Sequence, residues 1–427
     1  MLIFSYYDFC RIFCILNLKK RKIYSIMEKR TKKERGGFLK IGIFGGSFDP
    51  IHIEHIRLAK AAISSLGLDK LYIMPAAKPP HKKGKILSPD IHRLQMCRLA
   101  FEDEPKIEVS DYEMQNGGTS YTYLTCRHFK SLHEEAQLFW LVGTDMLRDF
   151  PTWKNPESIL NDVTLAVCAR AEKDGWEEKE IAVFCEKFHC QPAVISYNAS
   201  DVSSTQIRVL AGAGMRLDGL TDEKVAAYIR ENHLYEIPFA KDALALQNTK
   251  RAQHSLRVAK AAAKAANVWH IPERQAITAA LFHDCAKCLQ EGDTLLEGFV
   301  APSVWGEVPS PVLHQFAGAY LAKKTFGITD SDILNAIRFH TSGRENMSEL
   351  EKLIFLADML EEERDYEGVN ELRALFYAGK SDECMAAALW RSIQFIQKKG
   401  GDMYPLTLKA YEFYQKKGED YGKTNDE

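Results

Sequence analysis

The chain has 427 residues, 46% of them apolar, a length that can bury a large core and exceeds one average domain. Its net charge of −2 hides an asymmetry, because residues 1–40 hold eleven Lys/Arg against three Asp/Glu, a net of +8, and the remainder carries −10. A mildly acidic body gives no indication of a general nucleic-acid surface, and we expect no nucleic-acid partner. The ten cysteines follow no disulfide framework, which favours a reduced, cytoplasmic protein.

The first 26 residues resemble neither a membrane span nor a secretory signal. The apolar stretch Leu2–Leu18 is interrupted by Asp8 and Arg11 and lacks a basic start and a small-residue cleavage site. Met27 would make a sensible start, so we expect residues 1–38 to be a basic leader, disordered or from a mis-assigned start, without stable membrane insertion. A basic membrane-surface anchor is the alternative.

From Leu39 to Ala213 short apolar runs alternate with helical stretches such as His55–Leu66 and Ser88–Glu102, the latter opening with Ser88 as N-cap and Pro89 in the first turn. The strand-like runs are Leu39–Phe44, Lys70–Met74, Lys106–Val109, Gln137–Val142, Val163–Ala169 and Ala193–Ser196. Such alternation predicts an α/β fold: a Rossmann-like parallel sheet with helices on both faces. Ligands of such sheets bind beyond the carboxyl ends of the strands, where Gly45 and Asp145 follow two of these runs.

The glycine turn after the first strand predicts a phosphate site. Gly45 and Gly46 allow a tight turn and a close approach of backbone to ligand. The helix that follows offers unpaired N–H groups and the positive end of its dipole. His52 and His55 share one face of its first turn and can donate hydrogen bonds to a polyphosphate during transfer.

A second anion site is predicted at Ser203-Ser204-Thr205, where hydroxyl groups coincide with a helix start and Arg208 lies one turn in. An ordinary N-cap is the alternative for this segment. Because the first phosphate turn belongs to the same region, we favour phosphate binding.

The stretch around the first turn, Ile41 to His55, resembles the signature of the nucleotidyltransferases that make the adenylate half of NAD, in particular the bacterial nicotinate-nucleotide adenylyltransferases. Further segments follow in the family's order over residues 39–236: Pro75 to Lys82, His92-Arg93, Ser120 to Thr122, Gly143 to Asp145, Phe150 to Trp153 and Ser203 to Arg208. One position departs from the family pattern, since Glu54 stands where glycine precedes the second histidine. A first-turn glutamate is favoured by the helix dipole, and we expect its side chain to turn outward to solvent, with a blocked triphosphate site as the alternative.

The resemblance implies adenylyl transfer from ATP to nicotinate mononucleotide, with Mg²⁺ bridging the triphosphate oxygens and with His52, His55 and Arg208 on the triphosphate. It assigns Asp145 to the nucleotide and Trp153 to stacking on the pyridine ring, although a core aromatic is the alternative for Trp153. The substrate-binding residues it implies are Gly45, Gly46, Ser47, Phe48, Lys82, Arg93, Thr122, Gly143, Asp145, Trp153, Ser204 and Thr205. Lys82 and Arg93 suit a phosphate but could equally be solvated surface charges.

Residues 242–427 predict a second, all-α domain after a linker at 237–241, beginning with an alanine-rich helix, Ala243–Asn267. Its helical, mostly apolar context holds six ligand-type residues: His254, His283, Asp284, His314, His340 and Asp358. Neutral imidazole and carboxylate are ligands of hydrolytic transition-metal sites. One ion needs about four of them, so this set suffices for two, with Asp284 bridging and a hydroxide as nucleophile. Cys285 and Cys288 form a CxxC that lacks a second pair, which argues against a redox or zinc role.

This set resembles the HD superfamily of metal-dependent phosphohydrolases. Within that superfamily it is most similar to the bacterial HD enzymes that split diadenosine tetraphosphate symmetrically into two ADP. Asp284 and Lys287 are the catalytic residues that we expect, with Lys287 on a substrate phosphate. Iron is expected ahead of manganese or cobalt. Ser348 and Glu351 predict a capping box for a helix Ser348–Glu363 that carries Asp358. The run Glu361–Arg364 departs from the family's proline-containing version, and we interpret it as a solvated helical face.

The sequence thus predicts a bifunctional enzyme with ATP, nicotinate mononucleotide and diadenosine tetraphosphate as ligands, and a homo-oligomer is compatible with it. Two alternatives stay open. In one, only the HD hydrolase works, and the N-terminal domain is a nucleotide-binding regulator impaired by Glu54. In the other, the HD domain is metal-free and structural, against which the complete ligand set argues.

Overall fold

The computed structural model describes residues 38–79, 86–170, 176–290 and 292–423. Contacts divide the chain into two compact units. The first comprises the described residues up to Gly46 together with Arg57–Ala77 and Phe101–Ala199. The second comprises Ser47–Ile56, the described part of Lys78–Ala100, and the chain from Ser200 onward. Residues 1–37 of the expected leader, and Lys82, lie outside the described residues.

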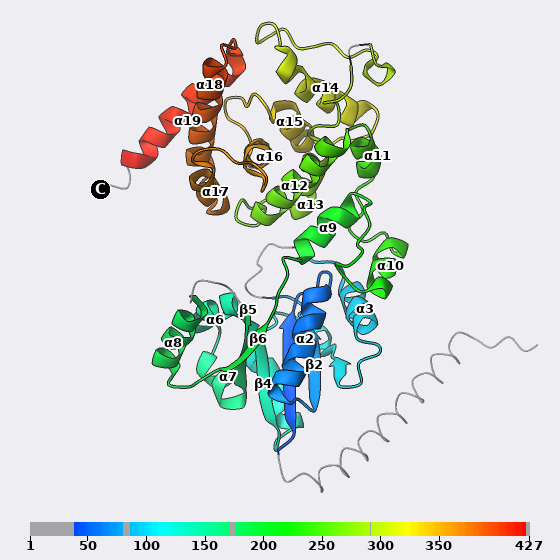
Figure 1. The fold of residues 1–427 in the computed structure, drawn as a ribbon, viewed down its shortest axis with the longest axis vertical. Helices are drawn as coiled ribbons and strands as arrows, with labels where there is room; N and C mark the ends of the chain where they lie inside the picture. Colours follow the sequence, from blue (N-terminus) through cyan, green and yellow to red (C-terminus); the bar gives the residue numbers. More distant parts are fainter. Residues whose placement is uncertain (1–37, 80–85, 171–175, 291, 424–427) are drawn as a thin grey trace, which may run out of the picture. The chain divides into compact units, whose positions relative to one another are not determined.

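The first unit is built on one sheet of six parallel strands, as expected (Figure 1). The strands are β1 Lys40–Gly46, β2 Lys70–Pro75, β3 Ile107–Val109, β4 Gln137–Gly143, β5 Thr164–Arg170 and β6 Ala193–Tyr197. Their order is β3-β2-β1-β4-β5-β6, so the direction of winding reverses between β1 and β4. Ile41 faces Leu138 and Phe44 faces Leu141 in that register. A reversal of this kind opens a crevice at the carboxyl ends of the two strands, where open α/β sheets bind ligands.

The helices that alternate with these strands follow the predicted pattern. They are α2 Ile53–Leu66, α3 Asp90–Ala100, α4 Tyr112–Asn116, α5 Thr122–Leu132, α6 Thr144–Asp149, η2 Phe150–Thr152, α7 Pro156–Asp162, α8 Trp176–Phe188, α9 Ser204–Gly212 and α10 Glu223–Glu231. One predicted cap is wrong: α3 begins at Asp90, and the backbone N–H of Ser88 donates to the Asp49 carboxylate at 3.2 Å. The carbonyl of Pro89 accepts the first helical hydrogen bonds instead.

The chain beyond α10 is all-helical, and the structure shows no strand in the described residues after Tyr197. The helices are α11 Ala240–Ala245, α12 Thr249–Ala265, α13 Glu273–Phe282, η3 Thr294–Leu296, α14 Ser310–Lys324, α15 Ser331–Phe339, α16 Glu349–Leu360, α17 Val369–Tyr377, α18 Ser381–Lys398 and α19 Pro405–Lys423. The expected helix Ala243–Asn267 is divided in two. The side chain of Asn248 accepts from the N–H of Arg251 and so starts a new helix.

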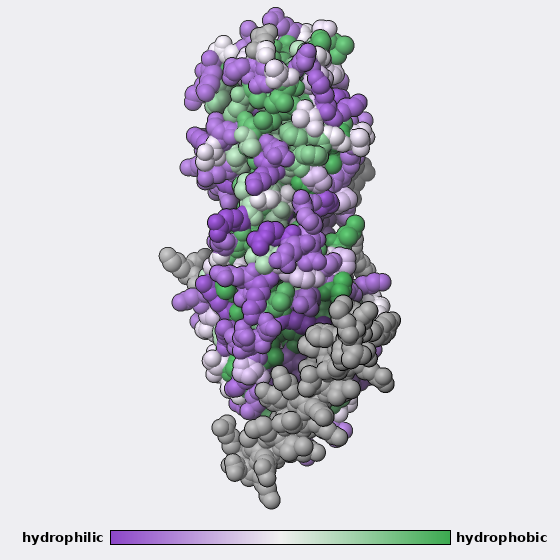
Figure 2. All heavy atoms as spheres, turned by 90° about the vertical axis from the view of Figure 1, so that its right-hand side faces the viewer, coloured by the Kyte–Doolittle hydropathy of each residue, from purple (hydrophilic) through white to green (hydrophobic). Residues whose placement is uncertain are grey.

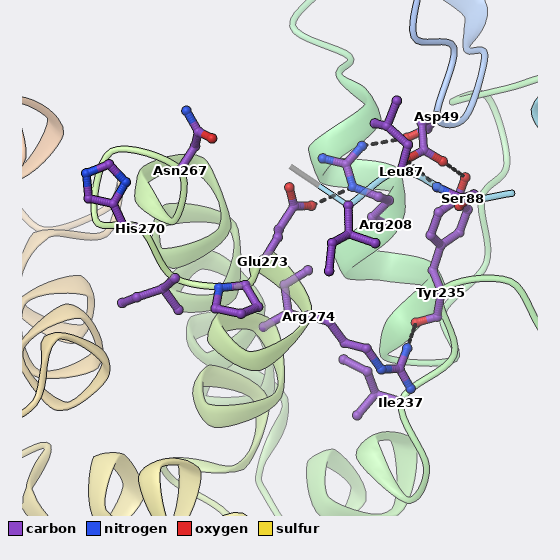
Figure 3. Close-up of a pocket in the computed structure, with 14 residues that line it drawn as sticks. Asp49, Leu87, Ser88, Arg208, Tyr235, Ile237, Asn267, His270, Glu273 and Arg274 are labelled. Atoms are coloured by element: carbon purple, nitrogen blue, oxygen red, sulfur yellow. Dashed lines mark hydrogen bonds and ion pairs between the residues drawn. The ribbon is translucent and has the colours of Figure 1, made fainter. Parts of the chain in front are cut away.

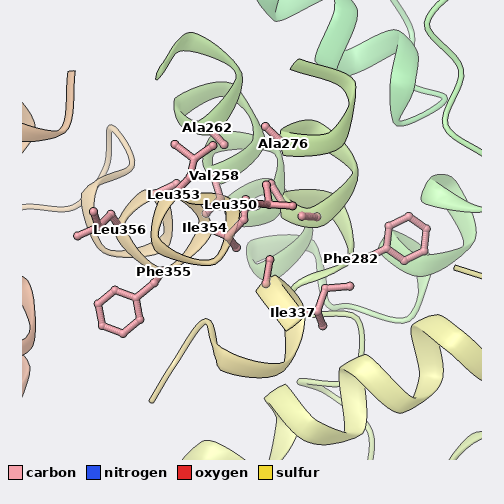
Figure 4. Packing of buried hydrophobic residues seen from close by; sticks show 14 of the residues in the cluster. Val258, Ala262, Ala276, Phe282, Ile337, Leu350, Leu353, Ile354, Phe355 and Leu356 are labelled. Carbon is pink, nitrogen blue, oxygen red and sulfur yellow. The ribbon is translucent and has the colours of Figure 1, made fainter. Parts of the chain in front are cut away.

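The core of this helical part is formed by α12, α13, α15 and α16 (Figure 4). Alanines such as Ala262 and Ala276 lie where α12 and α13 pack, and small side chains permit a close approach of helices. Larger side chains from α16, including Leu350 and Leu353, lie beside them, whereas Phe355 points away from them. The predicted capping box of Ser348 and Glu351 is present at the start of α16, which ends at Leu360.

The surface combines polar and apolar side chains. Figure 2 shows one face of the molecule, with hydrophilic residues over most of it and hydrophobic residues gathered in its upper half. Val300 and Val304 are among the large hydrophobic residues that are exposed. No described helix is both long enough and apolar enough to cross a membrane.

Candidate active sites

In the first unit, the predicted nucleotide residues Gly143 and Asp145 lie together at the carboxyl end of β4. Gly143 ends β4, and Asp145 lies in the first turn of α6, which starts there. A Cβ atom on Gly143 would lie 2.6 Å from Oδ1 of Asp145, so the carboxylate folds back over a residue that has no side chain. On neighbouring β1, a Cβ on Gly45 would lie 2.8 Å from the Trp140 ring. A side chain at Gly45 would therefore have to displace the indole of Trp140, whereas one at Gly143 would have to move the end of the Asp145 side chain.

Trp153 is buried in the apolar core of the same unit, 8% exposed, with its ring 5.3 Å from that of Phe150. This placement matches the core alternative, and the stacking role stays a prediction. Thr122 starts α5 and is partly exposed. The hydroxyl of the nearby Ser120 accepts from the backbone N–H of Ala77 and links two of the predicted family segments.

In the second unit, His52 and His55 lie together at the start of α2, as predicted. Their rings stack with centroids 3.6 Å apart, and the N–H of His52 donates to Nδ1 of His55 at 3.2 Å. Phe48, also predicted for the site, is 2% exposed, has a positive φ of 45° and packs edge-on against His55. A non-glycine residue with positive φ is uncommon, and here the buried ring fixes one imidazole.

The start of α9 lies beside this turn, so the structure brings the two predicted phosphate segments together. Ser203 is the N-cap of α9, as the alternative interpretation expected, and accepts from the N–H of Gln206. The hydroxyl of Ser204 donates to the carbonyl of Pro50 at 2.9 Å, and Arg208 donates to the carbonyl of Asp49. Two helix N-termini, two histidines and an arginine thus belong to one region, which is suited to a polyanion.

Glu54 is buried, and the expectation that it turns outward to solvent is wrong. It is 5% exposed, and its carboxylate accepts from the N–H of Ser200 at 3.0 Å and from its hydroxyl at 2.7 Å. Ser200 lies shortly before the N-cap of α9. The residue that departs from the family pattern therefore ties the first turn of α2 to the segment that leads into α9.

Arg208 lies at a cavity of about 440 Å³ (Figure 3). Its Nη2 donates to the hydroxyl of Thr205 at 3.0 Å, and its Nε donates to the carboxylate of Glu273, the first residue of α13, at 2.5 Å. On the far side of Arg208, the hydroxyl of Tyr235 donates to the Asp49 carboxylate at 2.7 Å. Glu273 and Tyr235 were not predicted, because no local motif marks either residue.

Arg93 is fully buried, so it is not a solvated surface charge. Its guanidinium donates to the carbonyls of Ser47 and Ser88 and to the Asp90 carboxylate. It holds the loop that contains Ser47, and its predicted contact with a substrate phosphate stays a prediction.

All six predicted metal ligands converge in the helical part. His254 lies on α12, His283 and Asp284 follow α13, His314 lies on α14, His340 follows α15, and Asp358 lies on α16. Ligand atoms of two groups lie within 4.8 Å of one another: His254, His283 and Asp358, and His283, Asp284 and His340. The two groups share His283. His314 lies beside the second group, 3.3 Å from Asp284 and 3.1 Å from His340.

The histidines present their Nε2 atoms to the carboxylates. Nδ1 of His283 contacts the carbonyl of Ala280 at 2.6 Å, and Nδ1 of His340 contacts that of Ile337 at 2.8 Å. Each Nδ1 is thus the donor, which leaves a lone pair on Nε2. Nε2 of His283 is buried and has no hydrogen-bond partner among the described residues. Such a lone pair beside ionised carboxylates fits a transition-metal ion.

The charges of Asp284 and His314 agree with this interpretation. Burial alone would raise the pKa of Asp284, but the neighbouring His283, His314 and His340 hold it well below its usual range. Burial lowers the pKa of His314 to about 4, so this imidazole is neutral at pH 7. Ionised carboxylates and neutral imidazoles are the protonation states that bind metal. For His254, burial would lower the pKa, but its contacts with Asp358 and Glu361 raise it, so a metal ion would have to displace a proton there.

Lys287 lies at the edge of the cluster, with Nζ 3.0 Å from Nδ1 of His314. Burial lowers its pKa from the ordinary value. Arg251 donates to the Asp284 carboxylate at 2.8 Å and Arg364 to that of Asp358 at 2.8 Å. Three basic side chains therefore border the predicted metal ligands. Of these three, the sequence had singled out Lys287.

Glu361 is part of this site, and its interpretation as a member of a solvated helical face is wrong. It follows the end of α16, is 2% exposed, and contacts Nδ1 of His254 at 3.2 Å. Nε of Arg257 donates to its other oxygen at 2.7 Å. These hydrogen bonds outweigh its burial and lower the pKa of Glu361 to about 2. The charged run in the sequence concealed one buried member.

Comparison with known proteins assigns the two parts of the chain to two families. Residues 43–210 match the Cytidylyltransferase-like family and residues 251–363 match the HD domain family. The chain is 32% identical over 331 residues to a Mycoplasma genitalium protein named probable nicotinate-nucleotide adenylyltransferase/Ap4A hydrolase, covering 77% of this chain and 89% of the relative. It is 38% identical to a probable nicotinate-nucleotide adenylyltransferase of Bordetella pertussis, covering 47% of this chain and 99% of the relative.

A solved structure of a predicted HD superfamily hydrolase involved in NAD metabolism, from Clostridium acetobutylicum, is 35% identical, with a TM-score of 0.37. The match covers 42% of this chain and 96% of that one. Fold and sites together define a nucleotidyltransferase-like domain followed by an HD domain with buried His/Asp metal-binding groups. The chain belongs to the family of these fused proteins, represented by the Mycoplasma relative.

Proposed function

We propose that the protein is a bifunctional enzyme of NAD synthesis and dinucleoside polyphosphate hydrolysis. Its first activity transfers the adenylyl group of ATP to nicotinate mononucleotide and gives deamido-NAD and pyrophosphate. Its second activity hydrolyses diadenosine tetraphosphate symmetrically to two ADP. The names of the fused relatives support both assignments.

In the transferase reaction, a phosphate oxygen of the mononucleotide attacks the α-phosphorus of ATP while the bond to the β-phosphate breaks. Catalysis is then mainly positioning and charge stabilisation. His52, His55 and Arg208 hold the triphosphate, and the first turns of α2 and α9 offer it backbone N–H groups. Mg²⁺ accompanies ATP as its bridging ion. The burial of Glu54 against Ser200 supports an active transferase, because two hydrogen bonds engage its charge.

In the hydrolase reaction, His254, His283 and Asp358 would hold one ion, because the single Nε2 lone pair of His283 can serve only one. Asp284, His314 and His340 would hold a second. Two bound ions would neutralise phosphoryl oxygens and activate water, and iron is proposed ahead of manganese or cobalt. Lys287 and Arg251 hold the substrate phosphates at the edge of the cluster. The observation that carries this function is the buried Nε2 lone pair of His283, which lies among the other predicted ligands and has no hydrogen-bond partner among the described residues.

The proposal is tested on the intact, metal-loaded chain by two product assays. Pyrophosphate is measured with ATP and nicotinate mononucleotide, and ADP is measured with diadenosine tetraphosphate. We expect both activities, with ADP as the sole hydrolysis product. If the hydrolysis products are ATP and AMP, the symmetrical cleavage is excluded. If the enzyme transfers the adenylyl group to nicotinamide mononucleotide more efficiently than to nicotinate mononucleotide, the assigned substrate changes.

We keep the sequence-based domain limits, 39–236 and 242–427, as part of this proposal. A cytoplasmic setting is also proposed, and the eight cysteines within the described ranges, all of them free, support a reducing compartment.

A further inference from the structure

Glu273 and Arg208 form a nearly buried ion pair whose carboxylate comes from the helix that leads to the metal ligands. Nε of Arg208 lies 2.5 Å from Oε1 of Glu273, and the two side chains are 9% and 17% exposed. Figure 3 shows the two side chains pointing toward one another from α9 and α13. Arg208 is held independently by its contacts with Asp49 and Thr205. Glu273 is thus not needed to hold the guanidinium near α9.

This pairing changes what an incoming polyphosphate meets. A guanidinium has five N–H groups and no acceptor, so each N–H given to Glu273 is withheld from a phosphate. The carboxylate also cancels the positive charge of Arg208 at short range. Since both side chains are largely buried, water screens this interaction little. A triphosphate that binds Arg208 therefore has to displace the carboxylate.

The surroundings allow such an exchange. The cavity of about 440 Å³ is lined by both members of the pair and by Asn267 and His270, which leaves room for the Glu273 side chain to turn away. Glu273 is also the first residue of α13, where the helix dipole favours a carboxylate. Its negative charge thus retains a stabilising partner after it leaves Arg208.

We propose that Glu273 competes with the triphosphate of ATP for Arg208 and thereby sets the affinity of the transferase for ATP. This inference rests on the proposed function, in which Arg208 binds the triphosphate. The residue comes from the region matched by the HD family, whereas Arg208 comes from the region matched by the transferase family. The fused chain thus contains an affinity-determining residue that a separate transferase domain would lack.

The test is equilibrium dialysis of Mg-ATP with the intact chain and with Glu273→Gln, which keeps the side-chain size and removes the charge. We expect the variant to bind ATP about tenfold more tightly, the effect of roughly one charge-assisted hydrogen bond. ATP should also raise its melting temperature more than that of the parent chain, because the nucleotide then replaces the lost counter-charge. Glu231→Gln, at an exposed position on α10, removes the same charge and should change neither value.

A double-mutant cycle separates this inference from the function beneath it. Arg208→Gln should weaken ATP binding, and Glu273→Gln should have no effect in the Arg208→Gln background. If Arg208→Gln leaves binding unchanged, the proposed role of Arg208 fails. If Arg208→Gln weakens binding but Glu273→Gln does not tighten it, the competition is overturned. Should Glu273→Gln not fold, Glu273→Asp retracts the carboxylate by one methylene group and should tighten binding to a smaller extent; unchanged affinity there would overturn the inference.

Discussion

The imidazole of His254 lies between two carboxylates, with Nε2 2.8 Å from Asp358 and Nδ1 3.2 Å from Glu361. Asp358 belongs to the predicted metal ligands, whereas Glu361 does not. A carboxylate behind a ligand histidine fixes the ring orientation and raises the basicity of the nitrogen that binds metal. Arg257 in turn holds Glu361.

Glu361→Gln should therefore weaken metal binding by about 10- to 100-fold, as is usual for changes behind a ligand histidine. The measurement is a competition titration of the apo chain against a metal-binding dye. Glu362→Gln is the matched control. The Glu362 carboxylate is next to Glu361 in the sequence, but it is 54% exposed and pairs with Lys260. Equal affinity for the two variants would contradict a role of Glu361 at the site.

Metal content is the second prediction. Six ligand-type residues are enough for two ions, because Asp284 has two carboxylate oxygens and can serve both, whereas the single Nε2 lone pair of His283 serves one. Elemental analysis of the intact chain, purified without chelators, should approach two ions per chain. A preparation with one ion or fewer and full hydrolase activity would contradict a binuclear site.

The third prediction separates the two activities. His283→Ala or Asp284→Ala should abolish ADP release from diadenosine tetraphosphate, because each removes a ligand from a buried cluster. Pyrophosphate release from ATP and nicotinate mononucleotide should persist in both variants. Circular dichroism and thermal unfolding check that the variants are folded. Loss of both activities in a folded variant would contradict two separate sites.

Glu54 is the subject of the fourth prediction, because its buried contact with Ser200 gives it two separable effects. Glu54→Gln removes a negative charge near the proposed triphosphate site but keeps an acceptor for Ser200, so it should lower the KM for ATP. Glu54→Gly also removes that acceptor and should reduce the free energy of unfolding by about 1–3 kcal/mol. Steady-state kinetics and chemical denaturation measure the two effects.

If Glu54→Gln leaves the KM for ATP unchanged, the charge has no influence on binding. If the natural chain shows no transfer and Glu54→Gly restores it, the N-terminal domain is a regulator rather than an enzyme.

The fifth prediction concerns Gly143. A Cβ at this position would lie 2.6 Å from Oδ1 of Asp145, so Gly143→Ala has to move the carboxylate proposed for the nucleotide. We expect a higher KM in the transferase reaction and an unchanged hydrolase rate. Gly219→Ala is the comparison, because no atom lies within 4 Å of a Cβ there, although its positive φ makes a small loss of stability expected. An unchanged KM for Gly143→Ala would argue against a nucleotide role for Asp145.

The sequence alone determined the class of the fold and the candidate ligands. Strand-like runs with helices between them predicted the parallel sheet, because burial on both faces makes such strands continuously apolar. The candidate metal ligands were recognisable because His and Asp are rare in apolar helical contexts. The capping box of Ser348 and Glu351 was confirmed, because it depends only on contacts within four consecutive residues.

Only the tertiary structure decided which distant side chains meet. Glu54 and Ser200 are 146 residues apart, His254 and Glu361 107, and Arg208 and Glu273 65. Periodicity describes the backbone and the buried face of one element, whereas these pairs depend on how separate elements pack. A charged residue in a polar run resembles a solvated one in sequence. Only the tertiary structure shows that such a residue is buried and which side chain of another helix pairs with it, as Arg257 pairs with Glu361.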